Sequence, residues 1–167
     1  MLLDAWREVH AAVPDASLVI LGDGALRERL LRQVETLGLS SSVSLPGRRQ
    51  DVEECLAAAD LYVSSSETEG MSNALLEALA SGVPVVATRI SGAEDLVVDG
   101  ENGLLVPPGE TGSLAAALIR LLEDDDARSR LGRAARRRIE VGFSLEAVAA
   151  RYRATYERLA GPQRRGR

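Results

Sequence analysis

The sequence predicts an α/β fold, in which a doubly wound parallel sheet is followed by C-terminal helices. Short apolar runs alternate with segments of helical periodicity, which is the pattern of parallel βαβ units. The first of them, at 17–22, is a continuous aliphatic and β-branched run, as expected of a strand that is buried on both faces. The chain of 167 residues is 46% hydrophobic and 27% charged, which is enough for one domain with its own core. We assign this domain to residues 1–160 and treat 161–167 as a basic tail.

The alternation begins at the N-terminus. Apolar residues at helical spacing predict a helix over 2–13, which Pro14 stops. The run SLVILG then predicts a buried strand at 17–22. An amphipathic helix is expected over 26–37, and Gly38 ends it.

The remaining elements repeat this pattern until the chain becomes fully helical. Strands are expected at 42–47, 60–66, 83–89 and 103–109. Helices are expected at 51–59, 74–82, 111–123, 126–141 and 144–160. Asp51 is placed to cap the first of these helices. No linker or internal repeat interrupts the series, so a single domain is expected.

Glycine, serine and charged residues gather in the loops that follow the strands. These loops are 22–25, 46–50, 64–73, 88–94 and 106–110. Because open α/β sheets bind ligands beyond the carboxyl ends of their strands, these loops form the expected binding region. Gly22 and Gly24 are expected in a tight turn at the cleft floor, since GDGALR lacks the third glycine of a dinucleotide fingerprint. Gly47 and Arg48 lie in the next loop, where Arg48 would face phosphate or stand at the rim.

Charge and cysteine content exclude several classes of function. The net charge is −5, so nucleic acid is not an expected partner. All 20 basic residues are arginine, which excludes a P-loop lysine or a Schiff-base lysine in this chain. The single Cys55 and the single His10 argue against a metal site or a Cys–His pair. The start, MLLDAWREVH, lacks the features of a signal peptide, so a cytoplasmic location is expected.

The segment ETEGMSNALLEALA, residues 67–80, places a carboxylate inside an apolar helix. Ser72 or Asn73 can cap this helix, whose first N–H groups favour an anion such as phosphate, and Gly70 permits close ligand approach. A buried unpaired carboxylate is costly, so Glu77 requires donors, which ribose hydroxyls would supply. An arginine partner or a solvent-facing side of the helix would also satisfy Glu77, and the helix pattern does not separate these readings.

The run from Glu69 to Ala78 resembles the signature of glycosyltransferase family 4, whose mark is two glutamates separated by seven residues, as Glu69 and Glu77 are. The flanking segments match in order over essentially the whole chain. They are LVILGDG (18–24), LPGRRQDV (45–52), AAADLYVSSSETEG (57–70), SGVPVVATRISGAEDLV (81–97) and DGENGLLVPPGE (99–110). The resemblance implies the Rossmann-like, donor-binding C-terminal half of a retaining enzyme with the GT-B fold.

The resemblance also implies roles for single residues. Glu69, as the catalytic residue, would contact hydroxyls of the donor sugar, and Glu77 would hold the ribose hydroxyls. Backbone N–H groups at 71–72 would face the sugar, those at 73–74 the diphosphate, and the loop 45–48 the base. The residues so assigned to donor binding are Glu77, Gly70, Met71, Ser72, Asn73, Ala74, Gly22, Gly24, Gly47 and Arg48.

The chain departs from the family pattern at its N-terminal side. The acceptor-binding N-terminal domain is absent, and so is the first strand of the C-terminal half, with the arginine and lysine that contact the diphosphate. Charge neutralisation would then fall on the helix at 73–80 and on Arg48. In the strand order 3-2-1-4-5-6 the absent strand would lie between those at 17–22 and 60–66. We therefore expect a closed-up sheet of altered order, or a chain that is unstable or oligomeric through unpaired sheet edges.

The resemblance defines the expected ligands and leaves alternatives. The donor would be a UDP- or GDP-linked sugar, with no metal or other cofactor. The full enzyme would act in polysaccharide or glycolipid synthesis and transfer the sugar to an acceptor hydroxyl. It would associate peripherally with the inner face of the membrane. The isolated chain would be inactive.

A non-catalytic nucleotide-sugar-binding or interaction module is the main alternative, and the absent phosphate clamp favours it. A dehydrogenase-like domain is a third, which the absent third glycine and the lack of an acidic residue after 42–47 oppose.

Overall fold

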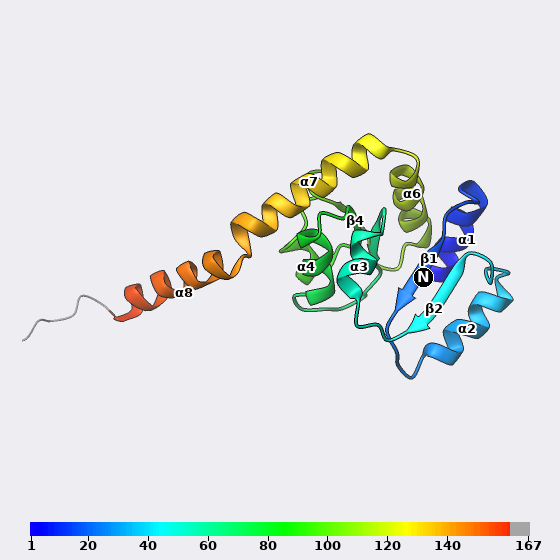
Figure 1. Ribbon diagram of the computed structural model, residues 1–167, viewed down its shortest axis with the longest axis horizontal. Coiled ribbons are helices and arrows are strands. Elements are labelled where there is room, and N and C mark those ends of the chain that lie inside the picture. The colour runs from blue at the N-terminus through cyan, green and yellow to red at the C-terminus, as the bar shows by residue number, and fades with distance from the viewer. Residues whose placement is uncertain (161–167) are drawn as a thin grey trace, which may run out of the picture.

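The computed structural model describes residues 1–160 and contains every strand that the sequence predicts (Figure 1). The predicted basic tail at 161–167 lies outside the described residues. The strands are β1 (Leu18–Leu21), β2 (Val43–Gly47), β3 (Tyr62–Ser64), β4 (Val85–Thr88) and β5 (Leu104–Val106). The helices are α1 (Leu2–Ala12), α2 (Arg27–Thr36), α3 (Val52–Ala57), α4 (Asn73–Ala80), α5 (Ser91–Glu94), α6 (Thr111–Leu122), α7 (Asp125–Gly142) and α8 (Leu145–Ala160).

Two local features differ from the sequence-based expectation. Asp51 occupies the N-cap position of α3, but its carboxylate pairs with the Arg49 side chain and makes no cap hydrogen bond. The helix α5 was expected only as part of a loop. It forms because the carbonyl of Ile90 accepts hydrogen bonds from the N–H groups of Ala93 and Glu94.

The parallel sheet β3-β4-β5 has a hydrophobic core on each face. Successive side chains of a strand point to opposite faces, so the strands supply both cores. One core, shared with α1 and α6, contains Val86, Leu104 and Val106. The other, shared with α4, contains Val85, Ala87 and Leu105. This arrangement, in which α7 contributes to both cores, is the doubly wound layering that the sequence predicts.

The helix α1 joins the parallel pair β1–β2 to the rest of the molecule. Its buried residues Leu3 and Trp6 belong to the same core as Leu118 of α6. The indole N–H of Trp6 donates a hydrogen bond to the Ser42 hydroxyl at 3.3 Å, just before β2. The two strand groups are therefore connected through helix packing.

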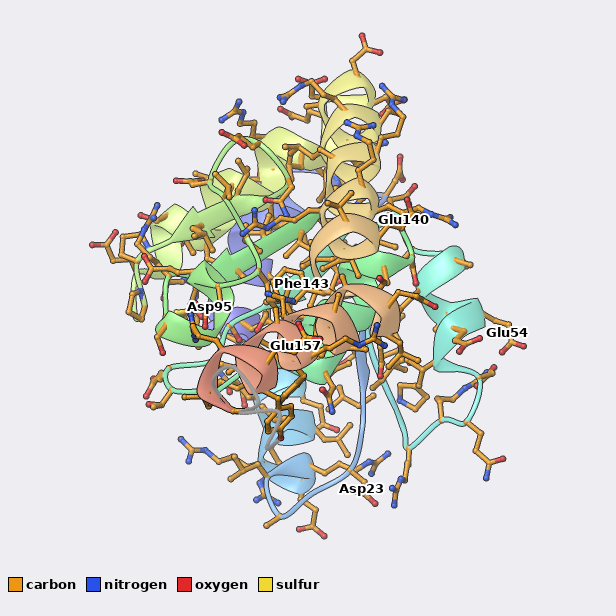
Figure 2. The ribbon with its side chains drawn as sticks, turned by 90° about the vertical axis from the view of Figure 1, so that its left-hand side faces the viewer. Asp23, Glu54, Asp95, Glu140, Phe143 and Glu157 are labelled. Atoms are coloured by element: carbon orange, nitrogen blue, oxygen red, sulfur yellow. The ribbon has the colours of Figure 1, made fainter. Side chains whose placement is uncertain are left out.

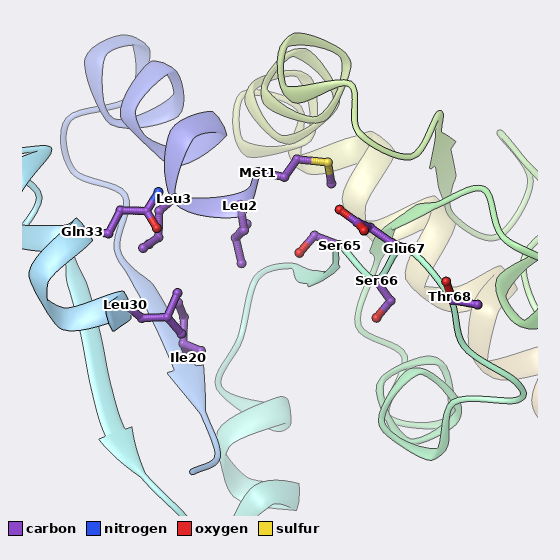
Figure 3. Close-up of a pocket in the computed structure, with 10 residues that line it drawn as sticks. All are labelled: Met1, Leu2, Leu3, Ile20, Leu30, Gln33, Ser65, Ser66, Glu67 and Thr68. Carbon is purple, nitrogen blue, oxygen red and sulfur yellow. The ribbon is translucent and has the colours of Figure 1, made fainter. Parts of the chain in front are cut away.

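The predicted closed-up sheet is wrong, because β1 and β3 share no hydrogen-bonded ladder. A cavity of about 690 Å³ lies between β1 and the loop after β3 (Figure 3). It is lined by Met1, Leu2, Leu3, Ile20, Leu30, Gln33, Ser65, Ser66, Glu67 and Thr68. The packing of α1 against α6 holds β1 away from the short spacing, about 4.8 Å, that pairing with β3 requires. That the isolated chain is unstable or oligomeric stays a prediction.

Of the C-terminal helices, α6 and α7 pack on the cores of the sheet, whereas α8 extends away from it. Phe143, which follows α7, packs against the core that contains α4 (Figure 2). The following α8 has no buried residue and projects from the body of the molecule (Figure 1). Within residues 1–160, no helix combines the length and the apolar character that a membrane span needs.

Candidate functional site

Ser72 is the N-cap residue of α4, and the N-terminal end of this helix is open to a ligand. Its hydroxyl accepts a hydrogen bond from the N–H of Leu75 at 3.4 Å, and its carbonyl accepts one from the N–H of Leu76 at 3.0 Å. Within residues 1–160, the N–H groups of Asn73 and Ala74 have no hydrogen-bond partner, and both residues are exposed. Of the two caps that the sequence predicts, Ser72 and Asn73, the structure contains Ser72. The free N–H groups and the helix dipole make the start of α4 suitable for an anion.

Of the readings that the sequence leaves open for Glu77, the structure shows a solvent-facing side of the helix and, within residues 1–160, no arginine partner. Leu75, Ala78 and Leu79 of α4 are buried, whereas Glu77 lies on an exposed face. Among the described residues, no salt bridge involves Glu77. The helix has an apolar sequence because its exposed face carries alanine, at Ala74 and Ala80, beside Glu77. Glu77 thus needs no buried partner in this structure and is free to meet a ligand.

Glu69, Gly70 and Met71 are exposed in the loop that joins β3 to α4. Both Glu69 and Glu77 lie close enough to Tyr62 of β3 to act on its phenol: burial raises the pKa of Tyr62, and the two negative charges raise it further. The fold therefore brings both glutamates within electrostatic range of Tyr62. The sequence reading missed Tyr62 as a neighbour of the site, because a tyrosine in an apolar strand carries no signal of its own.

The Tyr62 pKa predicts how stability depends on alkaline pH. The phenol ionises near its ordinary pKa of 10.0 in the unfolded chain but at higher pH in the folded chain. The folded chain thus retains the phenol proton to a higher pH than the unfolded chain does. The free energy of unfolding should therefore fall as pH rises above 10. The chain has no lysine, so few other groups titrate in this range. Denaturant unfolding at increasing pH measures the effect.

The control for this titration is a second tyrosine. Tyr62→Phe should reduce the alkaline loss of stability, whereas Tyr156→Phe on the exposed helix α8 should leave it unchanged. Equal behaviour of the two variants would contradict the raised pKa of Tyr62.

The carboxyl ends of β1 and β2 form a second group of predicted residues. A cavity of about 600 Å³ is lined by Asp23, Gly24, Ala25, Arg27, Glu28, Pro46, Gly47 and Arg48. The N–H of Gly22 donates to the carbonyl of Gly47 at 2.9 Å, which ties the two loops together. Gly22 and Gly47 have φ angles of +119° and +83°, which favour glycine.

Arg27 is a cavity residue that the sequence reading did not select. Its guanidinium donates to the carbonyl of Leu45 at 3.0 Å, which holds α2 against β2 at the cavity. Arg48 is exposed at the rim of the same cavity. The predicted residues thus gather in two places, the β3–α4 loop with α4 and the ends of β1 and β2, and both lie at the carboxyl ends of strands.

Comparison with known proteins identifies the family of this chain. The family model described as "Glycosyl transferases group 1" matches residues 1–124. The chain belongs to the glycosyl transferases group 1 family. It is 37% identical over 145 residues to the lipopolysaccharide core biosynthesis glycosyltransferase LpsE of Rhizobium meliloti, covering 87% of this chain and 43% of LpsE. It is 34% identical over 142 residues to the N-acetyl-alpha-D-glucosaminyl L-malate synthase of Bacillus anthracis, covering 85% of this chain and 37% of that enzyme.

Solved structures confirm the fold of this group 1 chain. HepE of Anabaena, crystallised in complex with UDP, is 29% identical with a TM-score of 0.85, over 93% of this chain and 43% of HepE. The C-terminal domain of the group 1 protein LpcC of Francisella tularensis is 25% identical with a TM-score of 0.78, over 86% of this chain and 78% of that domain. The chain spans less than half the length of the curated relatives named above. The predicted Rossmann-like fold, as in the C-terminal half of GT-B enzymes, is confirmed.

Proposed function

We propose that this chain is the donor-binding half of a retaining glycosyltransferase of family 4. The full enzyme moves a sugar from a nucleoside diphosphate to an acceptor hydroxyl. The observation that carries the proposal is the grouping of exposed Glu69 and exposed Glu77 beside the open N–H groups at the start of α4. Two carboxylates bind hydroxyls and a helix N-terminus binds phosphate, so together they match the two ends of a nucleotide sugar.

The residue roles follow the chemistry of this donor. Glu69 accepts hydrogen bonds from hydroxyls of the donor sugar, and Glu77 from the ribose. Backbone N–H groups at 71–72 face the sugar, with Gly70 allowing the close approach, and those of 73–74 contact the diphosphate. The residues at the ends of β1 and β2, which are Gly22, Gly24, Gly47 and Arg48, lie on the base side. Catalysis then consists of positioning and of stabilising the departing diphosphate.

The donor is a UDP- or GDP-linked sugar, and the proposal requires no metal or other cofactor. HepE is crystallised with UDP and with UDP-glucose. A relative from Corynebacterium glutamicum, 37% identical over 159 residues, is named as a GDP-mannose-dependent mannosyltransferase. Both bases therefore remain candidates for this chain.

The proposal includes the other partners of the full enzyme. An N-terminal domain binds the acceptor and completes the active site, so the chain alone is inactive. The full enzyme works in the cytoplasm and associates with the inner face of the membrane through its other half. Within residues 1–160, β1 and β3 each have an edge that pairs with no other strand, and through these edges the chain forms homo-oligomers.

A calorimetric titration of the chain with UDP, GDP and their sugar conjugates tests the proposal. Saturable binding of one nucleotide at one site is the expected result and names the base. Circular dichroism and a melting curve establish that the titrated chain is folded. Absence of binding to the folded chain would contradict the donor-binding proposal.

A second candidate is a non-catalytic nucleotide-sugar-binding module. Such a module would hold the nucleotide sugar with the same exposed glutamates and the same open N–H groups at the start of α4. Nucleotide binding alone does not separate the two candidates. Transfer restored by fusing the chain to the N-terminal half of LpsE would favour the enzyme, and persistent inactivity of a fusion that binds donor would favour the module.

A further inference from the structure

The loop that carries Glu69 is fixed at its beginning by β4. Thr88 is the last residue of β4, and its side chain is almost fully buried. Its hydroxyl donates a hydrogen bond to the carbonyl of Ser66, at the start of the loop. A buried threonine whose hydroxyl donates to a loop carbonyl holds that part of the backbone in one position.

Gly92 of α5 contacts the same loop at Glu69 and Gly70 themselves. An ideal Cβ at Gly92 would lie 1.7 Å from the carbonyl oxygen of Gly70 and 2.9 Å from that of Glu69. Real Cβ atoms essentially never come within 3.0 Å of such atoms. Any side chain at position 92 must therefore displace either α5 or the loop.

The residues around α5 make the loop the part that moves. Ala93, Leu96 and Val97 are buried in the core that contains α4. The guanidinium of Arg138 on α7 donates to the carbonyl of Leu96 at 2.7 Å and to that of Asp95 at 3.1 Å.

Asn102 adds a further anchor and is only 2% exposed. Its side chain donates to the carbonyl of Leu96 at 3.1 Å and accepts from the N–H of Val98 at 2.6 Å. By contrast, residues 67–71 are exposed. The segment from α5 to β5 therefore acts as a fixed support, against which the loop rests.

We propose that Gly92 and Thr88 are positioning residues for the sugar end of the donor. They set the backbone of residues 66–70 and so the place of the Glu69 carboxylate. The start of α4 has its own anchor in Ser72, so the nucleotide end is set independently. This inference rests on the proposed donor-binding function and adds to it the support that fixes the sugar contact.

The experiment compares two affinities in the 167-residue chain. Calorimetry gives the Kd of a nucleotide and of its sugar conjugate, using UDP with UDP-glucose and GDP with GDP-mannose as probes. Gly92→Ala should raise the ratio of conjugate Kd to nucleotide Kd by roughly tenfold or more, because the sugar contact is misplaced. The nucleotide Kd should stay within about twofold of wild type, because its contacts lie apart from the displaced backbone.

Gly132→Ala is the matched control. Its Cβ would lie 2.1 Å from the carbonyl oxygen of Gly82, a clash of the same kind between α7 and the end of α4. It should lower stability but leave the affinity ratio unchanged. If Gly92→Ala fails to fold, Thr88→Val removes the hydroxyl without a clash and should raise the same ratio, and Thr88→Ser should restore it.

The outcomes separate the inference from the proposed function. A ratio unchanged in both Gly92→Ala and Thr88→Val overturns the inference, as does an equal weakening of nucleotide and conjugate. If the wild-type chain binds none of the probes, the proposed function fails. In that case the inference is tested by the NMR chemical shifts of the backbone amides of Glu69 and Gly70. These shifts should change in Thr88→Val, although residue 88 is remote in sequence. Unchanged chemical shifts would overturn the inference.

Discussion

Glu77→Ala should weaken nucleotide binding by about 1–3 kcal/mol, which corresponds to roughly five- to 150-fold in Kd. Glu77 lies on the exposed face of α4, and within residues 1–160 it has no salt-bridge partner, so its carboxylate is available to ribose hydroxyls. Hydrogen bonds to a charged group are stronger than those between neutral groups. The alanine side chain of the variant cannot accept the hydrogen bonds that the ribose hydroxyls donate to the carboxylate. Calorimetry with the nucleotide that the wild-type chain binds measures the difference.

The exposed position of Glu77 also makes this variant easy to interpret. Because the side chain is exposed and makes no salt bridge within the described part of the chain, its removal should leave the free energy of unfolding nearly unchanged. Glu67→Ala is the matched control, since Glu67 is an exposed carboxylate that precedes α4 and lacks the family spacing. Equal affinities in wild type and Glu77→Ala, with both chains folded, would place the ribose elsewhere.

Glu69→Gln should lower sugar transfer by about a hundredfold, with a much smaller effect on nucleotide affinity. The amide keeps the size of the side chain but loses the charge that strengthens hydrogen bonds to the sugar hydroxyls. A sugar held in a displaced position reacts more slowly even when the nucleotide is still bound, because rate depends on the geometry of the reacting atoms. The measurement is transfer by the chain fused to the N-terminal half of LpsE, provided that the wild-type fusion is active.

A split between kcat and KM distinguishes this role from a structural one. A loss in kcat at unchanged KM for the donor indicates a contact that matters in the transition state. Glu67→Gln, two residues earlier in the same exposed loop, should keep the wild-type rate. A rate of Glu69→Gln equal to that of wild type would remove Glu69 from the catalytic role.

The local elements could be predicted because their signals lie in short stretches of sequence. Aliphatic runs predict the strands, and the serine before α4 predicts the cap that the structure contains. Of the residues predicted in the loops at the carboxyl ends of β1 and β2, Gly24, Gly47 and Arg48 line one cavity. The sequence could not decide what surrounds Glu77, because helical periodicity does not show which face of α4 is covered by packing. In the structure the covered face is the one with Leu75, Ala78 and Leu79.

The sequence by itself determined the order of strands and helices, the glycine-containing turns and the spacing of Glu69 and Glu77, because each depends on neighbouring residues or on a helical period. Only the tertiary structure decided that β1 stays apart from β3, that Tyr62 lies beside both glutamates and that Gly92 rests against the loop of Glu69. These features join segments that are distant in the chain. Their distances follow from how α1, α6 and α7 pack around the sheet, and close packing of this kind leaves no trace in any single stretch of sequence.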